Sequence, residues 1–314
     1  MVDIAPFSGL LFNQDKTGSI TEVVAPPYDV IRPHQQEELY EKNPYNVVRL
    51  ILGKQYPDDN ENNNRYTRSA KDFQEWVKEG ILTQDKQPCF YVYSQDYSVD
   101  GQPISRVGFF ARVKLEDFSE GNICPHEFTL AKAKKDRTHL LEACRANFSP
   151  IFGLFSDPQE EIDKKLEKIK EQTPLGVIAD GQITHRLWRL DDKEIIDSLT
   201  ASFRNKKIFI ADGHHRYETA LAYSKRSESK GTDSKHVMIF LTNMESQSLS
   251  IFPIHRLIRC PSPFNREDFL TKIGKYFDVK SLPGQTPAEE IKAILEKQGS
   301  GDNIVFIVYM KDGG

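Results

Sequence analysis

The sequence predicts an α+β fold, because strand-like and helix-like segments follow one another along most of the chain. Two patterns support this. Cys89–Tyr97 and Ile104–Leu115 are strand-like runs on either side of Asp100-Gly101, a dipeptide typical of a tight hairpin turn. Farther along, an apolar run ends at Asp212-Gly213 and is followed by residues at helical spacing. The first pattern favours a pair of antiparallel strands, and the second favours a strand, a turn and a helix.

The composition is that of a soluble globular protein with one or two cores. The chain has 314 residues, of which 38% are hydrophobic and 28% charged. It has no apolar run of about 20 residues and no leader with a basic start and an apolar centre, so we expect a cytoplasmic protein without membrane contact. The net charge of −4 does not favour a nucleic-acid partner. Four widely spaced cysteines with no CxxC pair fit reduced thiols.

Residues 1–115 are expected to form an N-terminal α/β unit. Pro33–Lys42 is helix-like, as is a segment with apolar residues at helical spacing from Tyr66 to Val77 that ends at Gly80. Val47–Leu52, which reads VVRLIL, is mostly apolar, and we interpret it as a buried strand.

Residues 116–260 are expected to form a second unit. The predicted helices are Lys135–Ala146, Lys193–Phe203 and a helix from Arg216, and the predicted strands are Thr184–Leu190, Lys207–Ala211 and Val237–Leu241. A further charged helix carries the apolar stripe Ile162, Leu166 and Ile169, and we interpret it as a solvated surface element.

Residues 261–314 are expected to be a truncated C-terminal segment. Asn303–Tyr309 is strand-like and is followed by a turn signal in Lys311–Gly314, but the second strand of a hairpin is missing. We therefore expect the natural chain to continue beyond Gly314.

Ile208–Ala222 is the strongest candidate for a functional site. A helix that begins directly after a strand directs its first amide N–H groups and the positive end of its dipole to one point, which suits a phosphate. Gly213 allows close approach of the backbone, and Arg216 can form two parallel bonds to phosphate oxygens. His214 and His215 add further donors.

Asp212 requires a separate explanation, because a carboxylate repels a bare phosphate. We interpret it as a ligand of a bridging Mg²⁺ or as a group that handles a proton. The alternative is that Asp212 only caps the helix and that His214 and His215 are ordinary surface groups. A zinc site at the two histidines is less favoured, since no HExxH pattern is present.

Three other segments have both a structural and a functional interpretation. Lys132–Arg137 is a basic cluster, either a solvated helix start or a clamp for an anionic substrate in which Arg137 binds the anion. Ala25–Val30 is either a rigid corner or a loop that presents Tyr28 and Asp29. Asn147 either ends a helix or forms a polar edge of the site.

Six stretches together resemble one family. They are APPYDVI (Ala25–Ile31), NPYNVVRL (Asn43–Leu50), PHEFT (Pro125–Thr129), KDR (Lys135–Arg137), ANFSPIFGLFSD (Ala146–Asp157) and ADGHHR (Ala211–Arg216). The chain resembles the domain of unknown function 1015 family over nearly its whole length. The turn from Gly213 to Arg216 is similar to the glycine-x-x-arginine signature of the ParB/sulfiredoxin superfamily. This resemblance implies a mixed-sheet, nucleotide-binding core in residues 116–260, with the N-terminal α/β unit as an addition.

One branch of that superfamily, the free serine kinases, is similar to this chain in the PHE segment and in DGHHR. The resemblance implies that Glu127 is the base that acts on the serine hydroxyl, and that Gly213, His214, His215 and Arg216 hold the phosphates of ATP or ADP. Asp212 would bind Mg²⁺ or assist catalysis. His126, Thr129 and Arg137 are the expected substrate-binding residues. Sulfiredoxin chemistry is not supported, because His214 occupies the position of the catalytic cysteine.

We therefore expect a nucleotide-dependent small-molecule kinase, which could form a homodimer, that phosphorylates an amino-acid hydroxyl such as that of free serine. Two alternatives remain. One is a ParB-like nucleotide-binding switch without kinase activity, and the other is a phosphate-ester hydrolase that uses His214 or His215.

Overall fold

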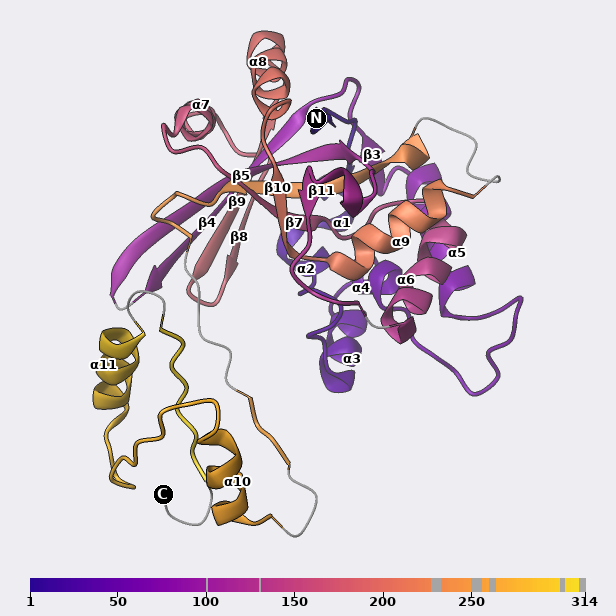
Figure 1. The fold of residues 1–314 in the computed structure, drawn as a ribbon. Coiled ribbons are helices and arrows are strands. Elements are labelled where there is room, and N and C mark those ends of the chain that lie inside the picture. The colour runs from indigo at the N-terminus through magenta and orange to yellow at the C-terminus, as the bar shows by residue number, and fades with distance from the viewer. Residues whose placement is uncertain are drawn as a thin grey trace. The chain divides into compact units, whose positions relative to one another are not determined.

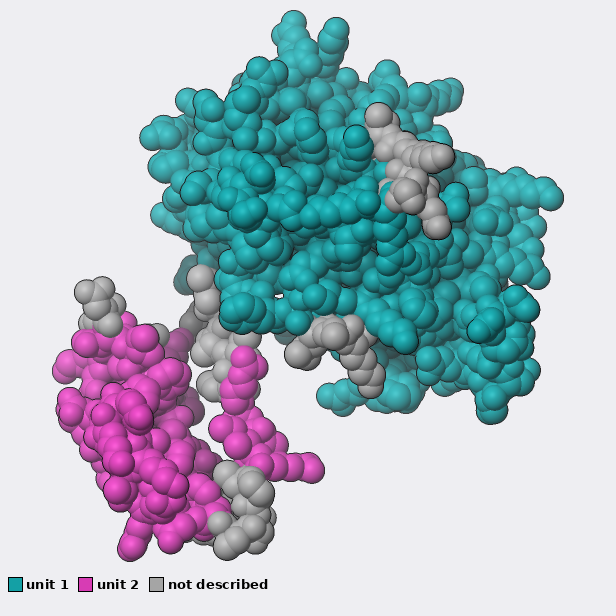
Figure 2. All heavy atoms as spheres, turned by 45° about the vertical axis from the view of Figure 1, so that its right-hand side comes forward, with its two compact units in different colours: residues 1–251 teal, residues 252–314 magenta. Residues whose placement is uncertain are grey.

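The computed structural model describes residues 1–99, 101–129, 131–226, 233–249, 256–259, 264–299 and 303–310. Contacts divide the chain into two compact units, residues 1–251 and residues 252–314, which are coloured separately in Figure 2. The expected α+β class is confirmed, because a large mixed sheet is combined with many helices. The domain boundary predicted at residue 115 falls inside the first unit, directly after a strand, and stays a prediction. The boundary predicted at residue 260 lies outside the described residues.

A nine-stranded sheet forms the centre of the first unit (Figure 1). Its strands, in spatial order, are β6 (Ile123–Cys124), β10 (Ile208–Asp212), β7 (Ile151–Phe155), β11 (His236–Asn243), β5 (Gln102–Lys114), β4 (Phe90–Val99), β9 (Ile183–Leu190) and β8 (Gly176–Asp180), with β1 (Ile4–Ala5) also paired to β5. The pairs β6–β10 and β7–β11 are parallel, and the others are antiparallel. The predicted hairpin is confirmed, since β4 and β5 pair antiparallel up to Val99 and Gln102; Asp100 lies outside the described residues.

One face of this sheet packs against α7 (Glu161–Ile169) and α8 (Lys193–Phe203) to form the main core. The ring of Phe203 lies 5.7 Å from that of Phe109 and 4.9 Å from that of Phe155. The apolar stripe of α7 is at most 3% exposed. The helix therefore contributes its stripe to the core, and only its charged side is a surface element as predicted.

The remaining helices of the first unit are α1 (Gln14–Thr17), α2 (Ile20–Val23), α3 (Pro33–Lys42), α4 (Val48–Ile51), α5 (Arg65–Lys78), α6 (Ala131–Cys144) and α9 (His214–Ser224), with the short 3₁₀ turns η1 (Phe118–Glu120) and η2 (Asp233–Lys235). α5, α6 and α9 lie side by side in that order (Figure 1). A small second sheet pairs β2 (Leu10–Phe12) with β3 (Leu82–Gln84). Beside it, Leu50, Trp76, Ile81 and Leu82 form a separate hydrophobic cluster.

The predicted strand Val47–Leu52 is wrong, because Val48–Ile51 forms the helix α4. The Asn46 side chain is fully buried and accepts the amide hydrogen of Val48 at 3.0 Å, which starts the helical turn. Val48, Leu50 and Ile51 are all buried. A short, mostly apolar run has no periodicity that separates a buried strand from a buried helix segment.

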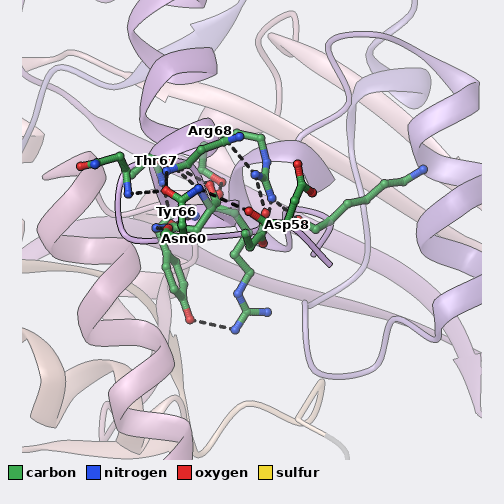
Figure 3. Close-up of polar contacts among 12 residues, drawn as sticks. Asp58, Asn60, Tyr66, Thr67 and Arg68 are labelled. Carbon is green, nitrogen blue, oxygen red and sulfur yellow. Dashed lines mark hydrogen bonds and ion pairs between the residues drawn. The ribbon is translucent and has the colours of Figure 1, made fainter. Parts of the chain in front are cut away.

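The polar loop before α5 is held by its own side chains (Figure 3). The Asn60 side chain accepts the amide hydrogens of Asn62 and Asn63, each at 3.0 Å, and Arg68 pairs with Asp59 at 2.7 Å. Asn64 caps α5 by accepting the amide hydrogens of its first turn. This loop therefore fixes where α5 begins.

The second unit contains α10 (Arg266–Ile273) and α11 (Ala288–Gln298). The predicted strand Asn303–Tyr309 is wrong, since 303–310 forms no regular element. A strand needs a neighbouring strand for its backbone hydrogen bonds, and none of the described residues pairs with this segment. The turn predicted at Lys311–Gly314 lies outside the described residues.

Candidate functional site

The predicted strand, turn and helix at Ile208–Ala222 are confirmed. Ile208 and Ile210 of β10 are fully buried, which anchors the strand in the main core. The chain turns at Gly213, whose φ of +94° lies in the left-handed region that favours glycine. α9 then begins at His214, two residues before the predicted start, and Tyr217 donates the first helical hydrogen bond to the Gly213 carbonyl at 3.0 Å.

The guanidinium of Arg216 lies directly over Gly213. A Cβ atom built on Gly213 would lie 3.0 Å from Cζ of Arg216, so a side chain there would push against the guanidinium. Arg216 donates hydrogen bonds to the carboxylate of Asp212 and to the carbonyl of Pro150. The positive charge at this turn is therefore paired with Asp212.

Parallel pairing of β6 with β10 brings the PHE segment to the same turn. Ile123 pairs with Ile208, and Cys124 with Phe209. Because the carboxyl ends of parallel strands meet at one edge of a sheet, the residues that follow β6 emerge beside those that follow β10. His126 donates its amide hydrogen to Nε2 of His214 at 3.2 Å. Two segments far apart in the sequence thus form one cluster.

Glu127 lies beside two imidazole rings. Its Oε2 atom is 3.7 Å from Nδ1 of His214, and its Oε1 atom is 3.9 Å from Nε2 of His126. Since Nε2 of His214 accepts a hydrogen bond, the ring proton of neutral His214 belongs on Nδ1, which faces Glu127. Nδ1 of His126 lies 2.7 Å from the carbonyl of Ile210, so this nitrogen carries a proton.

The two histidines differ in exposure. His214 is 2% exposed, and burial, reinforced by the neighbouring His126, lowers its pKa. The Glu127 side chain is 61% exposed. A neutral, buried imidazole therefore supports a carboxylate that solvent and ligands can reach.

Other predicted residues lie on the same side of α9. The Thr129 hydroxyl donates to Oε2 of Glu218 at 2.7 Å, and Lys134 donates to the same oxygen at 2.8 Å. Burial alone would raise the pKa of Glu218, but these two donors lower it. Glu218 was not predicted as a site residue. The signal that could have indicated it is its position on the predicted helix, two residues after Arg216. His215 is half-buried in the first turn of α9.

Arg137 is buried and held by several neighbours. Its Nε atom donates to Asp136 at 2.8 Å, its terminal nitrogens donate to the Ile51 carbonyl at 3.3 Å, and Tyr28 stacks on its guanidinium at 3.7 Å. Arg65 and Tyr66 hold Asp136 from α5. Ala25–Val30 therefore presents Tyr28 to Arg137.

Arg137 and Arg216 line one cavity of about 50 Å³, here named the small cavity. Asn147 and Ser149 line it too, in keeping with the polar-edge interpretation of Asn147. Thr219 completes it with a buried hydroxyl that has no hydrogen-bond partner among the described residues. Thr219 and the Pro150 carbonyl are site groups without a distinctive sequence signal.

α9 is fixed in its first turn by Tyr217. This side chain is fully buried, donates to the carbonyl of Glu116 at 2.9 Å and accepts the amide hydrogen of Glu116 at 3.1 Å. Its ring stacks on Phe118 at 5.1 Å. The start of α9 is thus held firmly relative to the sheet.

Asp212 is the last residue of β10 and its carboxylate lies directly before the turn. No group of three or more His, Cys, Asp or Glu among the described residues is arranged to hold a metal ion. Such a donor set does not make a closed protein site for Mg²⁺, but Mg²⁺ commonly takes one or two carboxylates and completes its shell with phosphate oxygens and water. Asp212, the predicted metal ligand, would supply one such carboxylate.

The fold and site together define an α+β protein with a candidate anion site at a helix start. The family model described as "Protein of unknown function (DUF1015)" matches residues 4–313. The chain belongs to this family, as its sequence stretches indicated. No curated protein and no solved structure matches the chain. Within the described part of the chain, every helix is too short or too polar to cross a membrane.

Proposed function

We propose that this protein is a nucleotide-dependent kinase that phosphorylates the hydroxyl of an amino acid such as free serine. The observation that supports the proposal best is the distance of 3.7 Å between Glu127 and Nδ1 of His214, the first residue of α9. It brings a carboxylate that can act as a base to the turn where a phosphate would bind.

In this proposal Glu127 accepts the proton of the substrate hydroxyl. The hydroxyl oxygen attacks the terminal phosphorus, and the bond from that phosphorus to the bridging oxygen breaks, which releases the shortened nucleotide. The phosphates would lie at the first amide groups of α9, with Arg216 donating to their oxygens. His214 and His215 would add donors. The proposed substrate contacts are His126, Thr129 and Arg137. Arg137 would contact the substrate while it remains paired with Asp136.

Asp212 is the proposed Mg²⁺ ligand. Its side chain is 65% exposed, but it is paired with Arg216 in this structure. A bound nucleotide would separate the pair, because its phosphates attract Arg216 and its Mg²⁺ attracts Asp212. The metal, when bound, would neutralise part of the negative charge of the phosphates. We further infer that the site is of the ParB/sulfiredoxin type, on the basis of the Gly213-x-x-Arg216 turn.

Phosphoserine formation tests the proposal. Native protein is incubated with serine, Mg²⁺ and either ATP or ADP, and the product is measured by mass spectrometry. Glu127→Gln keeps the size of the side chain but removes the base, so turnover should fall by roughly 10²-fold or more. Nucleotide affinity, measured by calorimetry, should stay close to the native value. Glu171→Gln, at an exposed residue, is the matched control.

Other results would favour the alternatives. Native protein that phosphorylates no hydroxyl amino acid would refute the kinase. Tight nucleotide binding in that case would favour a switch. A covalent phosphohistidine without nucleotide affinity would favour a hydrolase.

A further inference from the structure

The PHE segment, Pro125–Thr129, is hardly held by hydrophobic packing. The ring of Phe128 is fully exposed to solvent, and the side chains of His126 and Glu127 are 58% and 61% exposed. Burial of apolar side chains is the dominant favourable contribution to folding, so a segment that lacks it must be fixed by other contacts. The position of Glu127 therefore depends on the polar contacts before and after it.

Two polar anchors hold the PHE segment, one on each side of Glu127. The first is His126, whose amide hydrogen is donated to Nε2 of His214 at 3.2 Å. The second is Thr129, whose hydroxyl donates to Oε2 of Glu218 at 2.7 Å. His214 and Glu218 are four residues apart on α9, and residues at this spacing lie on the same face of a helix. The segment therefore follows one face of α9, with Glu127 between the two anchors.

Glu218 also joins the PHE segment to α6, which lies beside α9 (Figure 1). Lys134, in the first turn of α6, donates to the same Oε2 atom of Glu218 at 2.8 Å. Although burial acts in the opposite direction, the two donors lower the pKa of Glu218. A carboxylate that already accepts from two donors is a poor base, so Glu218 is suited to hold its neighbours in place rather than to accept the proton of a substrate.

We propose that Glu218 is a positioning residue, which holds the PHE segment against α9 and thereby keeps the carboxylate of Glu127 beside His214. Without the Glu218 carboxylate, the segment would keep its anchor at His126 and lose the one at Thr129. Glu127 would then spend less time at the start of α9. The effect on catalysis rests on the proposed function, but the position of the segment can be measured without any reaction.

Hydrogen exchange of the full chain, followed by NMR, tests the position of the PHE segment. The His126 amide is the reporter, since its hydrogen bond must open before its proton exchanges. Glu218→Ala should raise the exchange rate at His126 at least about tenfold, and Glu218→Gln, which keeps an acceptor oxygen, should raise it less. The amides of β11 should exchange at the native rate in both variants, which shows that the fold is intact. Glu167→Gln, at an ion-paired glutamate of α7, is the matched control and should leave the His126 rate unchanged.

Phosphoserine formation tests whether Glu218 acts through Glu127. Glu218→Ala should lower kcat roughly tenfold and leave nucleotide affinity close to the native value. In protein that already carries Glu127→Gln, the same substitution should lower kcat no further, whereas independent roles of the two residues would give additive losses.

The inference is overturned if the His126 amide of Glu218→Ala exchanges at the native rate, or if the two substitutions lower kcat additively. Faster exchange at His126, in a protein whose native form phosphorylates no hydroxyl amino acid, would refute the proposed function and still support the positioning role of Glu218. The two failures can therefore be told apart.

Discussion

His214 joins Glu127 to the backbone of the PHE segment through its two ring nitrogens. Nδ1 lies 3.7 Å from Oε2 of Glu127, and Nε2 accepts the amide hydrogen of His126 at 3.2 Å. Because the ring is 2% exposed, water does not readily replace either partner. The acceptor nitrogen and the donor nitrogen can therefore be tested with different substitutions.

The first prediction separates these two nitrogens. His214→Gln places an amide near the Nε2 position and keeps an acceptor for His126, whereas His214→Asn places it near Nδ1 and keeps a donor toward Glu127. We expect His214→Asn to lose about 1–3 kcal/mol of unfolding free energy, because a buried amide hydrogen is left unpaired. His214→Gln should be more stable but lower phosphoserine formation roughly tenfold. Chemical denaturation and the kinase assay measure the two effects; identical behaviour of both variants would contradict the assignment.

The second prediction concerns Gly213. Gly213→Ala places a side chain at a positive φ and 3.0 Å from Arg216, so it should cost about 1–2 kcal/mol of stability and weaken nucleotide binding. Gly181→Ala is the control, since Gly181 also has a positive φ but has no atom within 4 Å of a built Cβ. Both variants should unfold more easily, and only Gly213→Ala should bind nucleotide less tightly in calorimetry. Equal affinities would argue against a phosphate at this turn.

The third prediction concerns the shape of the Arg216 side chain. Arg216 contacts Asp212 and Pro150 through separate nitrogens, which a single ammonium group cannot reproduce. Arg216→Lys should weaken ATP binding at least about tenfold, measured as a loss of the ATP-induced rise in melting temperature. Arg226→Lys is the control, because Arg226 pairs with Glu142 on the surface. If the two variants respond to ATP alike, the role assigned to Arg216 is wrong.

The fourth prediction is a pH dependence of stability. Nδ1 of His185 lies 2.6 Å from the hydroxyl of Tyr93, and burial lowers the pKa of His185 below 6.5, with Arg106 adding to and Asp180 opposing this shift. The unfolded chain therefore binds this proton more readily than the folded chain. The free energy of unfolding should decline as pH falls below about 6.5.

His185→Asn removes the titrating ring from this position and should make that decline smaller. Urea denaturation of both proteins at a series of pH values gives the measurement. His214 titrates in the same direction, so some decline remains in the variant. A slope equal to that of the native protein would show that His185 does not contribute.

Long elements with a clear period were predictable from the sequence. α3 and α8 have the predicted bounds, Pro33–Lys42 and Lys193–Phe203, because each has its own start signal and polar face. Val47–Leu52 failed because a short, mostly apolar run shows no period that separates a strand from a helix. Asn303–Tyr309 failed because a strand depends on a partner elsewhere in the chain.

In the candidate site, too, local features were predictable and contacts between distant segments were not. The turn at Gly213 and the helix after it could be predicted locally. The contact between Glu127 and His214 could not, since it depends on which strand lies next to β10, and only family resemblance suggested it. Pairing of Arg216 with Asp212 and burial of Arg137 depend on packing that a sequence pattern does not describe. Whether these residues bind a nucleotide stays a prediction.

The parallel pairing of β6 with β10 joins the halves of the site through backbone hydrogen bonds rather than through the chain between them. A break in the exposed turn at Gly181 would place Glu127 on one fragment and His214 with Arg216 on the other. Neither fragment alone would contain the arrangement, and reassociation of the two would restore it. The protein could therefore be divided into two fragments whose site forms only when the sheet assembles from both.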